Sequence, residues 1–358
     1  MGGFPAGWGE IADALLVQAR LVILIGPVDT GKSTLTVYLA NRSRQMGYTT
    51  AVVDADVGQS DIGPPTTIGL GIVRAEVEQL EQVPPVDLYF VGSTTPYGHV
   101  AEMVVGTKRM VDRAFALGAQ RVLVNTTGLI HGELGQALKY HKVDLLRPDA
   151  IIGLQRRGEA ECLLRIWEAL GYRIYRLPVD PRVRRRPLEV RAAFRRRRWR
   201  EYFGGSTLRK IKLGDIVIRR APVCTGVPLG PEERRTIGEL MGQPVLWAEK
   251  NRDTAVIVTP ELPAREAIID VAACLGVRRV ARVMSEHFTG LVISLVGESG
   301  RVLSLGCIAG LDYEEGALLV YAPCRGGEKV RLVEFGRERL DVSDFLDEAV
   351  HRHVGSRA

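Results

Sequence analysis

Short apolar runs alternate with longer amphipathic stretches over the first half of the chain. Several runs have the length and composition of buried strands, and most intervening segments are long enough for helices. The expected strands are Leu21–Ile25, Thr50–Asp54, Val86–Val91, Arg121–Asn125, Ala150–Leu154 and Arg173–Leu177. The expected helices are Lys32–Met46, Ala101–Leu117, Leu134–Leu146 and Glu159–Leu170. This pattern predicts an open, doubly wound α/β domain with a mostly parallel sheet covered on both faces.

The pattern changes after residue 204, where Gly204-Gly205 ends the last helix of this domain. Alternating runs follow, separated by Gly, Pro and acidic turns, and they are typical of strands. These runs are Lys210–Arg219, Ala255–Val258, Val292–Val296, Ala317–Tyr321 and Lys329–Phe335, with helices near Glu232–Met241 and Ser343–His353. We therefore predict two domains, an α/β domain over residues 1–204 and a smaller β-rich domain over residues 205–358.

One segment matches a complete P-loop, the phosphate-binding motif G-x₄-G-K-[ST], and it follows the first expected strand and precedes a helix. Its residues are Gly26, Pro27, Val28, Asp29, Thr30, Gly31, Lys32 and Ser33, with Thr34 next to them. The glycines let backbone N–H groups surround phosphate oxygens, and the start of the helix adds partial positive charge. The motif predicts a nucleoside triphosphate site in which Lys32 holds the β- and γ-phosphates and Ser33 ligates Mg²⁺.

Two acidic residues, Asp54 and Asp56, stand where the next strand ends. Acids at the carboxyl end of such a strand face the ligand crevice. There a carboxylate can hold the water shell of Mg²⁺ or accept a proton from an attacking hydroxyl. We assign this role to Asp56, and we expect Asp54 to cap the turn.

Two further loops are expected at the same edge of the sheet. One contains Ser93 and Thr94, and the other contains Thr126, Thr127 and Gly128. Small hydroxyl residues suit phosphate or sugar contacts, but they are also ordinary turn residues, so both interpretations stay open. The guanine-reading pattern N-K-x-D is absent, which argues against a typical switch GTPase.

Positive charge is concentrated in one segment. The chain has a formal net charge of +6, and residues 182–200 contain ten arginines against the single acid Glu189. Pro187 can start a helix, on which Arg191, Arg195 and Arg198 share one face. Its apolar residues are Leu188, Ala192, Trp199, Tyr202 and Phe203. The arginines either neutralise a transferring phosphoryl group or form a solvated, nucleic-acid-binding charge run.

At these residues the chain resembles the P-loop polynucleotide 5′-hydroxyl kinases. That family includes subunits of the eukaryotic pre-mRNA cleavage and pre-rRNA processing machineries, with archaeal single-chain relatives. Besides the P-loop, the resemblance rests on the blocks Asp56–Pro65, Gly92–Pro96, Asn125–Gly128, Arg186–Arg191 and Arg200–Phe203. These blocks span most of residues 20–204, whereas the later part is similar in general character only.

The resemblance implies transfer of the γ-phosphate of ATP, with Mg²⁺, to the 5′-hydroxyl end of RNA, with DNA as a further candidate. It implies that Asp56 is the general base, that Gln59 lies near metal or substrate, and that Thr126 and Gly128 belong to a clasp on the substrate end. Arg186 and Arg191 fall in a lid, at about residues 180–204, that closes over the transferring group. The chain has Leu129 where the clasp usually has Trp, and Pro187 where the lid often has Ser.

Two alternatives to a kinase remain. The chain could be a non-catalytic nucleotide-binding scaffold of an RNA-processing complex, or an NTPase switch acting on a protein partner. A small-molecule kinase has no need of an extended cationic track.

The cysteines are odd in number with no C-x-x-C pair, and no apolar run is long enough to span a bilayer, so we expect a cytoplasmic protein without a membrane partner.

Overall fold

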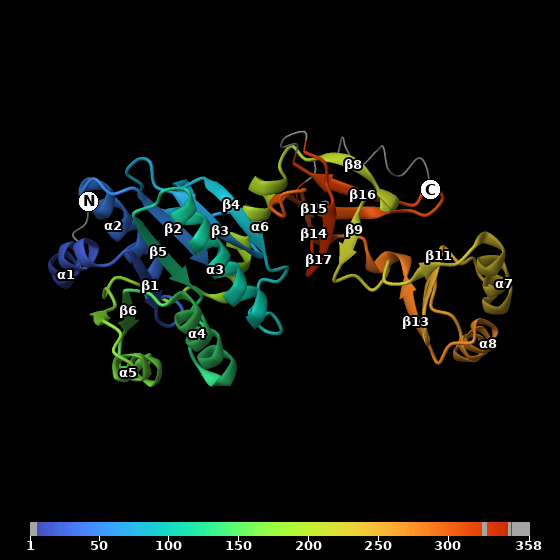
Figure 1. Ribbon diagram of the computed structural model, residues 1–358, viewed down its shortest axis with the longest axis horizontal. Coiled ribbons are helices and arrows are strands. Elements are labelled where there is room, and N and C mark those ends of the chain that lie inside the picture. The colour runs from blue at the N-terminus through green and yellow to red at the C-terminus, as the bar shows by residue number, and fades with distance from the viewer. Residues whose placement is uncertain (1–5, 324–327, 343–344, 346–358) are drawn as a thin grey trace. The chain divides into compact units, whose positions relative to one another are not determined.

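The computed structural model describes residues 6–323, 328–342 and 345. The chain divides into two compact units, Met1–Trp199 and Arg200–Ala358, and each has its own sheets and hydrophobic cores (Figure 1). The division falls within helix α6 (Leu188–Phe203), a few residues before the domain boundary expected from the sequence.

The first unit is built on a seven-stranded sheet with the order β4-β3-β2-β5-β1-β6-β7. All neighbours are parallel except β3, which is antiparallel to both β2 and β4. The strands are β1 (Leu21–Ile25), β2 (Thr50–Ala55), β3 (Thr67–Ile72), β4 (Pro85–Phe90), β5 (Arg121–Thr126), β6 (Ala150–Gln155) and β7 (Ile174–Pro178). The predicted mostly parallel α/β sheet is confirmed.

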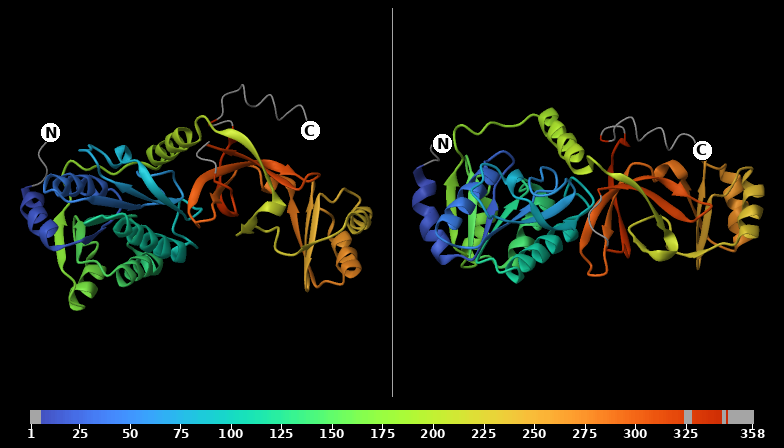
Figure 2. Two further views of the ribbon diagram at one scale, coloured as in Figure 1. Left: turned by 45° about the horizontal axis from the view of Figure 1, so that its top comes forward. Right: turned by 90° about the horizontal axis from the view of Figure 1, so that it is seen from above.

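Helices cover both faces of this sheet (Figures 1 and 2). The helices α1 (Ala6–Gln18) and α2 (Lys32–Gln45) pack on one face, and α3 (Val100–Ala116), α4 (Gly132–Leu146) and α5 (Glu161–Ala169) pack on the other. Each face buries its own apolar cluster, in which a fully buried Leu or Ile contributes about 1.5–3 kcal/mol. This rigid core holds the carboxyl ends of the central strands at one edge.

Strand β3 was not expected from the sequence, and it reverses the chain between β2 and β4. Its apolar pattern is broken by Gly69 and Gly71. A Cβ atom at Gly69 would lie 1.8 Å from the carbonyl oxygen of Ile62, so glycine is required where the preceding loop crosses the strand. A short 3₁₀ helix, η1 (Leu80–Gln82), follows instead of an α-helix.

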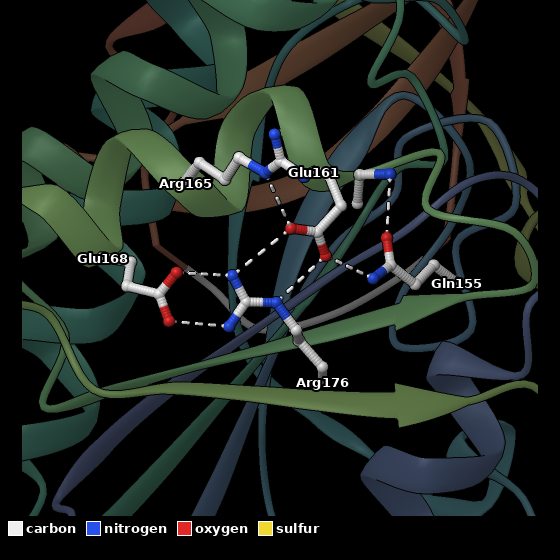
Figure 3. A network of polar contacts seen from close by, with 6 residues as sticks. Gln155, Glu161, Arg165, Glu168 and Arg176 are labelled. Atoms are coloured by element: carbon white, nitrogen blue, oxygen red, sulfur yellow. Dashed lines mark hydrogen bonds and ion pairs between the residues drawn. The ribbon is translucent and has the colours of Figure 1, made fainter.

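Helix α5 is fastened to the edge of the sheet by a polar network around Arg176 of β7 (Figure 3). Its guanidinium donates to Glu161 at 3.0 Å and to Glu168 at 2.7 Å, both on α5. Gln155, at the end of β6, also donates to Glu161. The Arg176 guanidinium, followed by the Gln155 amide, lowers the pKa of Glu161.

The second unit is β-rich, as predicted. A six-stranded sheet has the order β8-β16-β15-β14-β17-β9, and a four-stranded sheet has the order β10-β11-β12-β13. The first sheet contains β8 (Thr207–Lys212), β9 (Val217–Arg219), β14 (Leu291–Val296), β15 (Val302–Asp312), β16 (Ala317–Ala322) and β17 (Leu332–Arg339). The second contains β10 (Val227–Pro228), β11 (Trp247–Asn251), β12 (Thr254–Thr259) and β13 (Arg279–Met284).

Two helices, α7 (Pro231–Met241) and α8 (Arg265–Leu275), accompany the four-stranded sheet. The predicted continuous run Lys210–Arg219 is wrong, because the 3₁₀ turn η2 (Leu213–Asp215) divides it into β8 and β9. The sequence analysis did not predict α8 or the strands β10, β11, β13 and β15. The helix expected near Ser343–His353 lies almost wholly outside the described residues.

Candidate active site

The P-loop joins the end of β1 to the start of α2. Asp29 and Gly31 have φ angles of 54° and 83°, in the left-handed region. A Cβ atom at Gly26 would lie 2.3 Å from the carbonyl oxygen of Leu154 on β6, so only glycine lets the loop pass this strand. The Thr30 hydroxyl donates to the carbonyl of Pro27 at 2.9 Å and closes the turn.

Lys32 lies within this loop. It is buried, and its ammonium donates to the carbonyls of Gly26 at 2.9 Å and Pro27 at 2.7 Å. Burial lowers its pKa to about 8, against the opposite effects of Asp56 and Asp29. A phosphate in the loop would provide an anionic partner and favour the charged form of the lysine.

A cavity of about 520 Å³ lies in front of the P-loop. This volume is within the range of small-molecule binding sites. Among its lining residues are Val28–Thr34, Asp56, Gln59, Asp61, Asn125, Gly128 and Arg182–Pro187. The cavity thus brings together the P-loop, the loop after β2, the loop after β5 and the lid (residues 180–204).

Asp54 organises the loop after β2. It is fully buried, and its carboxylate accepts hydrogen bonds from the backbone N–H groups of Asp56, Asp61 and Ile62 and from the Asn125 amide. Burial, followed by the nearby carboxylates of Asp61 and Asp56, raises its pKa to about 8. The predicted turn-capping role of Asp54 is confirmed.

Asp56 has a different environment two residues later. Its Oδ1 atom accepts the backbone N–H groups of Gly58 and Gln59, both at 3.2 Å. Among the described residues, no donor is bonded to its Oδ2 atom. The carboxylate also lines the cavity, so one of its oxygens is available to a ligand there.

Two polar residues that the sequence reasoning did not assign complete this side of the cavity. The Asn125 amide bridges the Ser33 hydroxyl at 3.2 Å and Asp54 Oδ1 at 3.1 Å. Asp61 lies beside Ser33, and burial raises its pKa to about 6 while the bond from Ser33 lowers it. The sequence did contain a signal for both residues. Asn125 ends an apolar run, and Asp61 lies in the loop after β2, which are places where ligand-binding residues occur in such sheets.

The lid is attached to the P-loop through Asp29. One oxygen of the Asp29 carboxylate accepts the backbone N–H of Arg186 at 2.9 Å and the guanidinium of Arg191 at 2.6 Å. Arg156, after β6, donates to the Asp29 carbonyl at 2.7 Å. The Arg186 side chain is exposed and lines the cavity. Both predicted lid arginines therefore lie at the phosphate end of the site.

Helix α6 is held to the loops of the first unit by other arginines. Arg197 pairs with Glu81 at 2.8 Å, and Arg198 donates to the carbonyls of Asp61 and Gly63. The expected apolar face is wrong at its start, because Leu188 is 75% exposed. Val190, in the same turn, is 49% exposed, so the start of the helix is not anchored by a buried apolar face.

The predicted substrate residues divide into two groups. Gln59 and Gly128 line the cavity, and Gln59 also donates to the carbonyl of Arg191 at 3.5 Å. A Cβ atom at Gly128 would lie 2.5 Å from Val28 of the P-loop, so the two loops touch.

The other predicted substrate residues support the loops from beneath. Ser93 is buried and accepts the N–H of Thr95, while Thr94 lies against Gly58. The buried Thr126 donates to the carbonyl of Leu24, and Thr127 accepts the N–H of Leu129. The hydroxyl groups of Ser93, Thr126 and Thr127 therefore bond within the protein and support the loops.

A glycine loop between a buried strand and a helix, beside an acidic strand end and an arginine-rich lid, defines a P-loop nucleotide-binding protein of the phosphotransferase type. A family model described as the mRNA cleavage and polyadenylation factor CLP1 P-loop matches residues 26–205. The chain belongs to this CLP1 P-loop family.

Relatives of known name extend the match over most of the chain. It is 32% identical to a polyribonucleotide 5′-hydroxyl-kinase of Methanocaldococcus jannaschii, over 89% of this chain and 87% of the relative. A protein of the same name from Thermococcus kodakarensis is 33% identical over 89% of this chain and 88% of the relative. A solved Clp1p–Pcf11p complex matches the fold with a TM-score of 0.62 and 12% identity, over 93% of this chain and 78% of that chain.

Proposed function

We propose that this protein transfers the γ-phosphate of ATP to the 5′-hydroxyl end of RNA. The relatives that match most of the chain carry the name of this activity. The observation that carries the proposal is the meeting of the P-loop, Asp56 and the lid arginines around one cavity. A nucleotide-binding scaffold needs only the first of these three features.

Phosphate binding falls to the P-loop. Its backbone N–H groups and the buried Lys32 face the β- and γ-phosphates, as in other P-loop proteins. Asp29 keeps Arg191 beside the loop and Arg186 at the rim of the cavity. From these positions the two guanidinium groups neutralise charge on the group in transfer, which is the main contribution a protein makes to this chemistry.

The donors present suit Mg²⁺. The Ser33 hydroxyl would provide an oxygen ligand, and the Asp56 carboxylate would hold the water shell of the ion. Within the described ranges no group of three or more His, Cys, Asp or Glu residues could enclose a metal ion. This fits Mg²⁺, which is usually held by one or two protein oxygens together with waters and phosphates. When bound, Mg²⁺ supplies charge neutralisation for the phosphates.

Asp56 is the proposed general base. Asp54 is occupied by four donors, whereas Asp56 presents an oxygen to the cavity. The 5′-hydroxyl, seated between Gly128 and Gln59, donates its proton to Asp56 as its oxygen attacks the γ-phosphate. Positioning of this oxygen in line with the leaving group provides much of the rate enhancement.

We propose that the reaction takes place in the cytoplasm. The described cysteines are all free thiols, which suits a reducing compartment. In the part of the chain that the structure describes, no helix is both long and apolar enough to cross a bilayer. The basic lid suits an RNA end, and DNA is the alternative acceptor.

The test uses purified full-length protein, Mg²⁺ and γ-labelled ATP. The acceptors are a 5′-hydroxyl RNA oligonucleotide, its DNA counterpart and a 5′-phosphorylated RNA, and Lys32→Ala is the variant. We expect label on hydroxyl-ended strands only, and none with the variant. The ratio of labelled RNA to labelled DNA defines the acceptor class.

Two results would favour the alternatives. Nucleotide binding without any labelled acceptor supports the non-catalytic scaffold and removes the roles assigned to Asp56, Arg186 and Arg191. ATP hydrolysis that a protein partner stimulates, and that RNA ends leave unchanged, supports an NTPase switch.

A further inference from the structure

Two lysines occupy positions of α4 that belong to the core. The buried residues of this helix follow helical spacing and form a single face: Gly135, Leu138, Lys139, Lys142, Val143 and Leu146. Lys139 and Lys142 are both 0% exposed. A buried ammonium is costly unless hydrogen bonds compensate it, so each lysine requires an explanation.

The compensation differs between the two side chains. The Lys139 ammonium donates to the Thr126 hydroxyl at 2.9 Å and to the Thr127 carbonyl at 2.6 Å. The Lys142 ammonium has no hydrogen-bond partner among the described residues. Lys139 therefore makes two directed contacts with the clasp (Thr126–Gly128), and Lys142 makes none.

The contacts of Lys139 continue to the P-loop. Thr126, which accepts from Lys139, donates in turn to the carbonyl of Leu24 on β1, the strand that leads into the P-loop. Gly128, at the other end of the clasp, lies against Val28 of the P-loop. Lys139 is also close enough to Lys32 and Asp56 for their charges to affect its own ionisation. Lys139 thus connects helix α4 with the clasp and, through Thr126, with the strand that leads into the P-loop.

We propose that Lys139 is a positioning residue that holds the clasp at the distance from the P-loop that the acceptor end requires. This inference rests on the proposed function. An apolar side chain at this position would leave the Thr127 carbonyl and the Thr126 hydroxyl without their donor, and the clasp would relax from the P-loop. A displacement of about 1 Å at a reacting group can reduce the rate by about 100-fold.

Lys142→Met provides a matched control for Lys139→Met, since both remove a buried ammonium from the same face of α4. We expect Lys139→Met to raise KM for 5′-hydroxyl RNA and to lower kcat/KM by about 10- to 100-fold. The affinity for ATP without RNA should stay within about threefold of wild type. Lys142→Met should keep both quantities within about threefold of wild type.

A second pair of variants separates positioning from folding. Lys139→Gln can still donate to the Thr127 carbonyl and should recover part of the lost kcat/KM. Thr126→Val keeps the shape of the clasp but removes the hydroxyl contact, and it should reproduce part of the loss. If Lys139→Met does not fold, these two variants still distinguish a positioning role of Lys139 from a general structural role.

Two outcomes overturn the inference. In one, wild type labels RNA and Lys139→Met matches Lys142→Met in kcat/KM. In the other, Lys139→Met loses ATP affinity as strongly as RNA transfer, which marks a general structural role. Absence of labelling by wild type contradicts the proposed function itself and is distinct from both.

Discussion

At the scale of single residues, environment rather than residue type separates the roles of Asp54 and Asp56. Asp54 accepts four hydrogen bonds inside the protein, and it therefore serves the loop after β2. Asp56 uses one oxygen for its own turn and lines the cavity with the carboxylate. Of these two aspartates, Asp54 thus has a structural role and Asp56 a chemical one.

Asp56→Asn should bind ATP and lose transfer. The amide keeps the size of the side chain but cannot accept a proton, and loss of a general base costs about 100- to 10,000-fold in kcat. Labelled-phosphate transfer gives kcat, and calorimetry gives the ATP affinity. Full transfer by this variant would exclude Asp56 as the base.

Asp54→Asn should differ from Asp56→Asn, because Asp54 has a structural role. An amide nitrogen at one of the Asp54 oxygens would face backbone N–H groups, so a buried donor would lose its acceptor at a cost of about 1–3 kcal/mol. We expect this variant to lose thermal stability in addition to any loss of activity.

At the scale of elements, the carboxylate of Asp29 joins the lid to the P-loop. Asp29 binds both the Arg186 backbone, which precedes helix α6, and the guanidinium of Arg191, in the first turn of that helix. The pairing side chains are only partly exposed, 23% for Arg191 and 12% for Asp29. Such a contact is stronger than a fully exposed ion pair, which contributes about 0–1 kcal/mol.

Asp29→Asn should release the lid. Asn tolerates the left-handed backbone of this position, so the P-loop conformation is kept while the charge is lost. The exposed Arg184 and Arg185 then become easier targets for trypsin, which does not cleave after Arg186 because Pro187 follows it. Limited proteolysis followed by mass spectrometry should show faster cleavage there than in wild type. Equal cleavage rates would mean that Asp29 does not restrain the lid.

At the scale of the whole molecule, each unit has separate hydrophobic clusters. Unfolding of such a chain is not expected to be a single transition, so stability must be followed unit by unit. Lys142 is buried in the first unit, so its ionisation affects the stability of that unit and not of the second. Burial lowers the Lys142 pKa to about 7, and Asp56 and Asp54 act in the opposite direction.

Lys142→Met should change how the stability of the first unit depends on pH. The folded unit releases the Lys142 proton near pH 7 and the unfolded chain near its ordinary pKa of 10.5. Between these two pH values the unfolded state binds more protons than the folded state. The free energy of unfolding of wild type therefore rises with pH, by at most about 1.4 kcal/mol for each pH unit. Wild type should therefore gain stability relative to the variant as the pH increases from about 7 to about 10.

Hydrogen exchange of the β1 and β5 peptides, compared between the two proteins at each pH, measures this difference. The comparison cancels the titration of all other groups. A difference that stays constant across the range would mean that Lys142 does not titrate as a buried amine.

Much of the first unit was predictable because its signals are local. The strands β1, β2, β5 and β6 are short apolar runs between helices, and the P-loop is a contiguous motif in the required strand–loop–helix context. The strand β3 was missed because Gly69 and Gly71 interrupt its apolar pattern. Gly69 makes room for the Ile62 carbonyl and Gly71 for Val83, and the pattern along the chain does not reveal such packing contacts.

The phosphate-binding loop, the acidic strand end and the family can be read from the chain alone, since each depends on residues that are neighbours along it. The fold was needed to show that Asp29 holds Arg191, that Thr126 points inward and that Lys139 contacts the clasp. These contacts join separate elements, and they depend on strand order and on which helix face is buried. A motif fixes backbone shape locally, whereas the partner of a side chain is set by packing.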